Sequence, residues 1–350
     1  MWHKNKIGAK MTGNKCKNCG GELLFDVDSQ NLVCNHCSSV VEIEKETESL
    51  EKKPLTTDST ITLSKAEYSQ YTCGTCGRQH LSASDTPLTR CPSCGDCNLT
   101  KMVKVEYVPD GLISFKINKQ TAVNKLYSWL SKRPFSPNNL KHQATADTLI
   151  GVYTPAFSYD FNTFTKYSGV GIKSRTDKEG HTYVTRTNFS DTRSDKFVDY
   201  LESAGDSISS VKLRTIGPFS YGKVLCYSTE YLYGWIGETV NCNLQDNAKI
   251  MKQDVAFSIK HRVEFSQPYD RIENFYCNTT FNDMKYSYIY LPIYKGTYKY
   301  KQKKYTYFVN GENGKVTGKT PKSFWKIFFT VLGIGAVVGT IAYFVLKYAL

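Results

Sequence analysis

The chain has 350 residues and a formal net charge of +13, from 45 Lys and Arg against 32 Asp and Glu. Hydrophobic residues make up 40% of it and aromatic residues 13%, which is enough to build folded cores and excludes a chain that is disordered throughout. At this length we expect a multidomain protein of two or three folded units.

Residues 1–13 are polar and basic, and we expect a disordered N-terminus. They contain no apolar run of the kind that forms a secretory signal peptide. Met11 lies just ahead of the first cysteine pair, so translation could start at Met1 or at Met11, and the sequence does not decide between them.

Two stretches carry the same cysteine spacing, in which two Cys-x2-Cys pairs are separated by fourteen residues. Zinc binds four thiolates as a tetrahedron, and a Cys-x2-Cys turn places two of them on one side of the ion. The pattern therefore predicts two tandem four-cysteine zinc ribbons, small β units at 14–43 and 69–108, rather than a set of disulfides. The expected ligands are Cys16, Cys19, Cys34 and Cys37 in the first ribbon and Cys73, Cys76, Cys91 and Cys94 in the second.

Both zinc ions are expected to be structural. Four protein ligands leave no position for water or substrate, which a catalytic zinc needs. Glycine follows three of the four Cys-x2-Cys pairs, where a tight turn brings backbone amides toward sulfur, and Ser38 follows the remaining pair. We interpret His36, His80 and Cys97 as bystanders, because each site already has four cysteines.

The segment Glu42–Asp58 is charged, contains Pro54 and lacks apolar periodicity, so we assign 44–68 to a linker that lets the two ribbons move relative to each other. After Asp110 no further Cys-x2-Cys pair occurs and tyrosine becomes frequent, and we assign 111–318 to one α+β domain. Its cysteines are expected to be ordinary single thiols. They are Cys226, Cys242 and Cys277.

Within this domain, apolar residues at steps of three and four predict a helix that follows Asn118 and ends before Pro134, and a second helix at about 243–265. Two tight turns are expected at Asn310-Gly311 and Asn313-Gly314. Strand patterns occur at 149–153, 157–164, 286–294 and 305–309.

Lysine and tyrosine alternate over 295–307, in the sequence KGTYKYKQKKYTY. Such a segment can bind nucleic acid, with aromatic rings stacking on bases and lysines on phosphates. It can equally be a β-ribbon whose lysines face anionic lipid or solvent beside a membrane, and we favour this second interpretation.

No catalytic residue is assigned. The stretch 314–320 resembles a phosphate-binding loop, but Asn313 occupies the position where that motif needs its first glycine. His181 has carboxylates nearby, yet no HExxH pair or nucleophile elbow accompanies it, and we interpret it as an exposed loop histidine. We therefore expect a protein that is not an enzyme and that has no ATPase or helicase motif.

A stretch of twenty residues without a charge, 327–346, has the length of a helix that crosses a bilayer. It follows a basic juxtamembrane segment, 319–326. Residues 295–326 carry nine lysines against Glu312 alone, and an excess of positive charge is typical of the cytoplasmic side of a span. We expect a single-pass, tail-anchored membrane protein with its N-terminal bulk in the cytoplasm.

The basic charge is not on the ribbons. Residues 16–110 carry nine Lys and Arg against fourteen Asp and Glu, a net charge of 9 − 14 = −5. A nucleic-acid surface needs positive charge where it meets phosphate, so the ribbon region as a whole has the wrong sign for that role.

The chain resembles a group of bacterial membrane proteins described as transcription-factor-IIB-type zinc-ribbon proteins and sometimes labelled primosomal helicase-like, whose function is largely unassigned. The resemblance implies the architecture better than an activity, and it covers most of the chain. The family commonly has tryptophan where Tyr294 stands and glutamine where Glu312 stands. The segments that carry the resemblance are the cysteine pairs, 115–118, 129–133, 151–155, 291–294, 309–318 and 321–326.

We therefore predict a membrane-anchored cytoplasmic protein that holds two structural Zn²⁺ ions and acts as a protein-binding adaptor or scaffold. Its expected partners are membrane lipid, through 327–346, and an unidentified protein. The alternative is a membrane-tethered nucleic-acid-binding protein that uses 295–307. The oligomeric state is left open.

Overall fold

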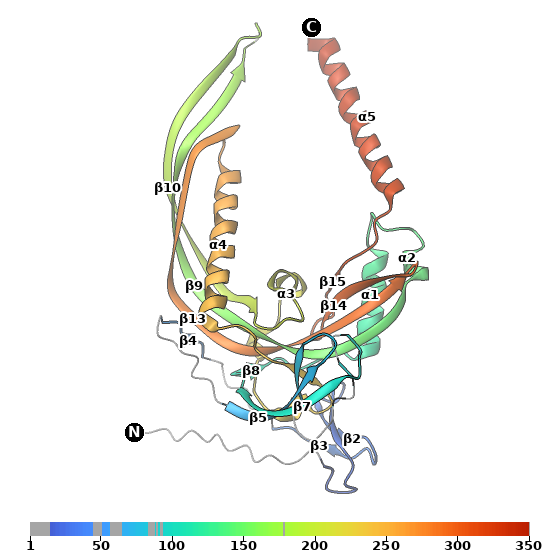
Figure 1. The fold of residues 1–350 in the computed structure, drawn as a ribbon. Helices are drawn as coiled ribbons and strands as arrows, with labels where there is room; N and C mark the ends of the chain where they lie inside the picture. The colour runs from blue at the N-terminus through green and yellow to red at the C-terminus, as the bar shows by residue number, and fades with distance from the viewer. Residues whose placement is uncertain are drawn as a thin grey trace.

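The computed structural model describes residues 15–44, 51–56, 65–82, 88, 90–91, 94–177 and 179–349. The expected disordered segment 1–13 and parts of the expected linker lie outside these residues. The described chain contains two four-cysteine groups in its N-terminal part, a large mixed sheet with helices, and one long apolar helix at its C-terminal end (Figure 1).

The first cysteine unit, which we call ribbon 1, is a small antiparallel sheet. It consists of β1 (Leu23–Asp26), β2 (Asn31–Cys34) and β3 (Val40–Val41), in that order. Side chains alternate between buried and half-buried along β1 and β2, as expected for a sheet with one face on a core. Ribbon 1 therefore presents one apolar face to the rest of the protein.

The second unit, ribbon 2, contains β5 (Lys65–Cys73), β6 (Gln79–Ser82) and β7 (Leu99–Tyr107), with β5 in the middle. The outer strand β6 also pairs with β12 (Ile236–Glu238). Since β12 is parallel to β9, ribbon 2 is joined by backbone hydrogen bonds to the large sheet of the domain that follows.

Three long strands form the frame of that domain: β9 (Thr145–Thr176), β10 (Thr182–Ser203) and β13 (Arg271–Tyr300). β9 is the middle strand and pairs antiparallel with both others. In Figure 1 these strands curve like a cradle, with the β9–β10 hairpin rising on one side and the β13–β14 hairpin on the other. The hairpin strand β14 (Lys303–Asn310) is followed by β15 (Val316–Gly318).

The curvature has a local cause. The register shifts between Phe197 and Tyr200, between Glu273 and Tyr276, and between Asn282 and Lys285. Each shift contains one Asp or Asn with a left-handed backbone, and an extra residue in a strand bends it and increases its twist. The three residues are Asp199 (φ 54°), Asn274 (φ 51°) and Asp283 (φ 52°).

Two longer helices pack on the curved sheet, one toward each of its raised ends (Figure 1). α1 (Lys119–Ser131) begins at Asn118, whose side chain accepts from the Thr121 amide, and α4 (Leu244–Ser266) begins at Asn243, whose side chain accepts from the Gln245 amide. Both agree with the helices expected from periodicity. Shorter helical and strand segments complete the domain: α2 (Leu140–Gln143), α3 (Ser210–Ile216), η1 (Tyr221–Lys223), η2 (Thr229–Leu232), β8 (Gly111–Leu112) and β11 (Leu225–Cys226).

Tyrosine forms much of the core. Eight of the twelve largest fully buried side chains are tyrosines, and several of their hydroxyls donate to main-chain or amide oxygens, as a buried hydroxyl requires. The strand segments expected at 149–153 and 157–164 are parts of the single strand β9. The segment 286–294 of β13 is buried on both faces instead of alternating, since ribbon 1, α1 and the α3 region cover it.

The described part of segment 44–68 is docked on the domain and differs from the free linker expected there. β4 (Lys53–Pro54) pairs with Lys285 and Tyr286 of β13. The Lys52 ammonium forms ion pairs with Asp160 and with Asp199, the latter at 2.6 Å. This chain segment is therefore held against the cradle next to one of its bulges.

The C-terminal helix α5 (Phe324–Ala349) stands apart from the core. Over Phe324–Lys347 it is long and apolar enough to cross a membrane, and none of the most apolar stretch is buried inside the protein. It begins three residues before the expected span 327–346. A buried core helix would have its apolar side chains covered, and here they are exposed. Figure 1 shows α5 extending away from the sheet.

Candidate metal centres

The four Cys-x2-Cys pairs adopt one and the same turn. In each, the amide of the residue after the second cysteine donates to the carbonyl of the first cysteine, at 2.8 to 3.0 Å. In each, the amide of the first cysteine also donates to the carbonyl five positions later, at 2.7 to 2.9 Å. The amides that close the turns belong to Gly20, Ser38, Gly77 and Gly95.

The residue after each pair has a left-handed backbone. Gly20, Gly77 and Gly95 have φ of 73°, 70° and 82°, and Ser38 has φ of 60°. Three of the four pairs thus use the residue that adopts this conformation without steric cost. Ser38 adopts the same left-handed conformation. The pair that lacks a following glycine therefore forms the same turn as the other three.

The turns bring four sulfurs together in each unit. The Sγ atoms of Cys16 and Cys37 lie 3.6 Å apart, and those of Cys19 and Cys34 lie 3.5 Å apart. In ribbon 2 the two corresponding distances are both 3.6 Å. All four sulfurs of a unit lie within 4.8 Å of one another. Zinc–sulfur bonds of about 2.3 Å in a tetrahedron place sulfurs about 3.8 Å apart, so both groups fit a zinc ion.

Hydrogen bonds to sulfur favour the thiolate form that a metal needs. The Ser39 hydroxyl, 3.0 Å from the Cys37 sulfur, and the Ser39 amide lower the pKa of Cys37 to about 6. In ribbon 2 the Cys76 amide, and then the Thr75 amide, lower the pKa of Cys73 to about 7. The Gly21 amide donates to the Cys19 sulfur at 3.4 Å. The turn geometry thus stabilises charge on Cys37 and Cys73 before any ion binds. At Cys19 the Gly21 amide lowers the pKa, but hydrogen bonds with the Cys37 and Cys34 sulfurs outweigh it and the pKa is raised.

His80, which the sequence led us to interpret as a bystander, instead contacts a ligand of the second site. It is buried, and its Nε2 is 3.6 Å from the Cys91 sulfur. Burial, and then the positive charges of Lys295 and Arg78, lower the pKa of His80 to about 4, so the ring is neutral at neutral pH. A neutral ring with its proton on Nε2 donates to the thiolate, as groups around metal ligands commonly do. No spacing rule would have identified this contact.

His36 and Cys97 are exposed and lie beside the first and second sites, respectively. A third group of possible ligands, Asp177, Glu179 and His181, lies at the exposed tip of the β9–β10 hairpin. The Asp177 carboxylate there accepts from the Glu179 and His181 amides, which accounts for the turn. The three single thiols of the domain are half-buried, as expected for small apolar residues.

The Lys/Tyr segment 295–307 is a hairpin of β13 and β14. Tyr298, Tyr300 and Tyr307 are buried, and the Tyr298 hydroxyl donates to the Lys319 carbonyl at 2.9 Å. Lys295 is half-buried, and the other lysines of the segment are exposed. Aromatic rings that are enclosed in the core are not available for stacking on bases.

The fold and the site define a protein with two four-cysteine metal-binding groups, a large mixed sheet and one apolar C-terminal helix. Among known proteins, a protein of Bacillus subtilis (strain 168) described as the uncharacterized protein YdjG is 25% identical over 319 residues, which is 89% of this chain and 91% of that protein. No protein-family model matches the chain. No solved structure matches it either.

Proposed function

We propose that this protein is a zinc-stabilised adaptor, anchored in a membrane by α5, that binds a partner protein on the cytoplasmic side. The single observation that carries the proposal is the closed geometry of both four-cysteine groups. Each has four thiolate ligands within bonding range of one ion, and such a site stabilises structure and leaves no place for a reacting molecule. Ribbon folds of this size have almost no core of their own, so the metal contributes directly to their folding.

The membrane anchor is supported by the length, hydropathy and exposure of α5. Phe324 and Trp325 are exposed at its start, where aromatic side chains favour the interface between water and lipid. Several lysines precede the helix, and by the positive-inside rule they favour a cytoplasmic location for this end and for the domain attached to it.

The most prominent exposed apolar side chains outside α5 lie on α4. Ile250, Phe257 and Phe265 are 53%, 64% and 84% exposed, and their spacing of seven and eight residues puts them on one face of the helix. His261 lies between Phe257 and Phe265 on this face, and its ring centroid is 4.4 Å from that of Phe257 and 6.0 Å from that of Phe265. The opposite face of α4 packs on the sheet.

This stripe is the surface that we assign to the partner. An apolar stripe with helical spacing matches the contact that another amphipathic helix makes, with side chains of one helix in the grooves of the other. Lys260 and Glu264 beside the stripe would form part of the polar rim of such a contact. Asp254 lies within the stripe, and its carboxylate is 3.2 Å from the Arg214 guanidinium.

The alternative, a nucleic-acid-binding protein that uses 295–307, lacks this kind of support, because three of the four tyrosines of that segment are buried. Its lysines are also partly neutralised. Asp147 pairs with Lys299 at 2.7 Å and with Lys304 at 3.1 Å, and these two lysines lower the pKa of Asp147 to about 2.

The adaptor proposal is tested by site-specific photo-crosslinking from position 257 in cells, followed by purification of the captured protein and measurement of its affinity for the full chain. We expect Phe265→Ala to weaken a saturable complex and Val211→Ala, at an exposed apolar residue of α3, to leave it unchanged. If Phe265→Ala and Val211→Ala bind the captured protein with equal affinity, the stripe is not its binding surface. Nucleic acid that binds the full chain with a steep salt dependence, and binds Phe265→Ala equally well, would favour the alternative.

The orientation is tested separately by protease digestion of sealed membrane vesicles. Inside-out vesicles should expose ribbon 1 and ribbon 2 to protease, and right-side-out vesicles should protect them. Protection in inside-out vesicles would contradict the cytoplasmic assignment.

A further inference from the structure

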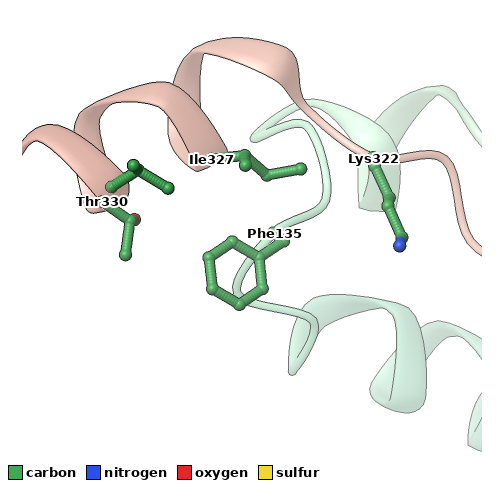
Figure 2. A pocket seen from close by; sticks show the side chains of 5 residues that line it. Phe135, Lys322, Ile327 and Thr330 are labelled. Carbon is green, nitrogen blue, oxygen red and sulfur yellow. The ribbon is translucent and has the colours of Figure 1, made fainter.

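A cavity of about 260 Å³ lies where α5 leaves the rest of the protein. Its lining residues come from the α1–α2 loop and from the start of α5. Figure 2 shows the Phe135 ring and the Ile327 side chain facing each other, with Lys322 on one side and Thr330 on the other. The lining residues are Phe135, Lys322, Ile327, Thr330 and Val331.

The lining is apolar apart from one charge. The Thr330 hydroxyl donates to the Lys326 carbonyl at 2.7 Å, within its own helix. The Lys322 ammonium is therefore the polar group of the lining that can bind a ligand. A molecule that fits such a site is apolar along most of its length and negatively charged at one end.

The cavity is built by specific contacts between distant parts of the chain. The Ser323 amide donates to the Phe135 carbonyl at 2.7 Å, and the Lys326 ammonium donates to the Pro134 carbonyl at 3.1 Å. Ile327, Thr330 and Val331 belong to the expected span 327–346. If α5 crosses a bilayer, the cavity therefore opens at the depth where head groups meet hydrocarbon.

Positive charge collects around this opening. The stretches 111–146, 284–311 and 313–350 contain no Asp or Glu. Hydrogen bonds of 2.8 Å from the Tyr300 hydroxyl to Asn139 and of 2.9 Å from the Tyr298 hydroxyl to the Lys319 carbonyl bring all three stretches together here. We call the basic collar seven exposed cations that lie within three residues of these contacts or of the Ser323–Phe135 contact, and outside the ion pairs of Asp147: Lys132, Arg133, Lys141, Lys301, Lys303, Lys319 and Lys322.

We propose that this cavity binds one acyl chain of an anionic phospholipid, with the lipid phosphate held by Lys322 and the neighbouring cations of the basic collar. The inference rests on the proposed membrane anchor and adds a lipid class to it. A phospholipid supplies both required features, an acyl chain for Phe135 and Val331 and a negative charge for Lys322. A free phosphate ion would satisfy the cations and leave the apolar cavity without a ligand.

The test uses the purified full-length protein in detergent micelles, titrated with phosphatidylglycerol, phosphatidylcholine or inorganic phosphate, with bound lipid counted by native mass spectrometry. We expect tighter binding of phosphatidylglycerol than of phosphatidylcholine. Lys322→Gln should weaken phosphatidylglycerol binding about fivefold, the usual effect of one cation near anionic lipid. Phe135→Ala should weaken it as well, because the chain loses its aromatic contact, and Phe135 is exposed enough for the protein to tolerate the change.

The matched control is Lys347→Gln, which removes one lysine at the other end of α5. Equal effects of Lys322→Gln and Lys347→Gln would overturn the proposal, as would equal affinity for the two lipids. Displacement of phosphatidylglycerol by inorganic phosphate at the same concentration would also overturn it, since the site would then recognise phosphate alone.

A separate experiment tests whether α5 anchors the protein in the membrane. In alkaline carbonate extraction of cell membranes, the wild-type chain should remain with the membrane. Release by carbonate would refute the anchor, whereas retention combined with equal binding of both lipids would refute only the lipid site.

Discussion

Ribbon 1 and ribbon 2 have the same turn contacts and the same sulfur arrangement, yet they are attached to the domain in different ways. Ribbon 1 docks mainly by packing its side chains into the domain: Phe25 packs on Tyr231 at 5.1 Å between ring centroids. The main-chain amide of Phe25 also donates to the Tyr233 carbonyl at 2.9 Å, and its carbonyl accepts from the Trp235 indole at 3.1 Å. Ribbon 2 docks through the backbone pairing of β6 with β12. The cysteine spacing specifies the local unit and does not specify what that unit packs against.

The difference extends to the core. Seven residues of ribbon 1, including Leu23 and Phe25, belong to the large apolar cluster of the domain. The described residues of ribbon 2 contribute none to it. Metal loss from ribbon 1 should therefore disturb the whole protein, and metal loss from ribbon 2 should stay more local.

The largest expected effect comes from removing one ligand in each ribbon. Cys16→Ser and Cys73→Ser should each reduce bound zinc from two ions to one, as measured by elemental analysis. Structural zinc supplies on the order of 10 kcal/mol, so each ribbon should unfold locally. Cys16→Ser should also lower the melting temperature of the domain, because it releases part of the shared core. Equal melting temperatures in the two variants would contradict the distinction drawn between the ribbons.

The next effect separates packing from metal binding. Phe25→Ala removes a buried aromatic ring at the contact of ribbon 1 with the domain, and we expect a loss of about 3–5 kcal/mol in the free energy of unfolding. Chemical denaturation followed by tyrosine fluorescence measures it, with zinc content as a second reading. Val40→Ala, at an exposed residue of β3, is the matched control and should cost far less.

A smaller effect concerns the group behind the second metal site. His80→Ala removes the imidazole beside the Cys91 sulfur, and we expect the zinc affinity of ribbon 2 to fall about 10- to 100-fold. Competition with a chromogenic chelator measures the affinity of each site. His36→Ala, in the exposed position of ribbon 1, should leave both affinities unchanged, and a similar loss in this variant would show that the buried contact has no special role.

The smallest expected effect tests the turn itself. Ser38→Gly relieves a left-handed serine and should stabilise ribbon 1 by about 0.5–1 kcal/mol, whereas Gly77→Ser places a side chain at the equivalent position of ribbon 2 and should destabilise it by about the same amount. Zinc-release rates of the two variants, relative to wild type, give the comparison. If Ser38→Gly and Gly77→Ser change the zinc-release rate in the same direction, the two turns are not equivalent.

Local features were predictable from the sequence where neighbouring residues determine them. The N-caps Asn118 and Asn243, with the apolar steps that follow, predicted α1 and α4 to within about two residues. Each Cys-x2-Cys pair predicted its own turn. The curvature of the sheet was not predictable, because Asp199, Asn274 and Asp283 are common polar residues whose bulges form only when the partner strand is in register.

The sequence by itself determined the eight thiolates, the two long helices of the domain and the apolar length of α5, because each depends on residues within a few positions of one another. Only the tertiary structure decided that the tyrosines of 295–307 are enclosed, that His80 lies against Cys91, and that Phe135 meets Ile327. These contacts join residues on separate elements, and they depend on how strands 30 residues long pair and curve.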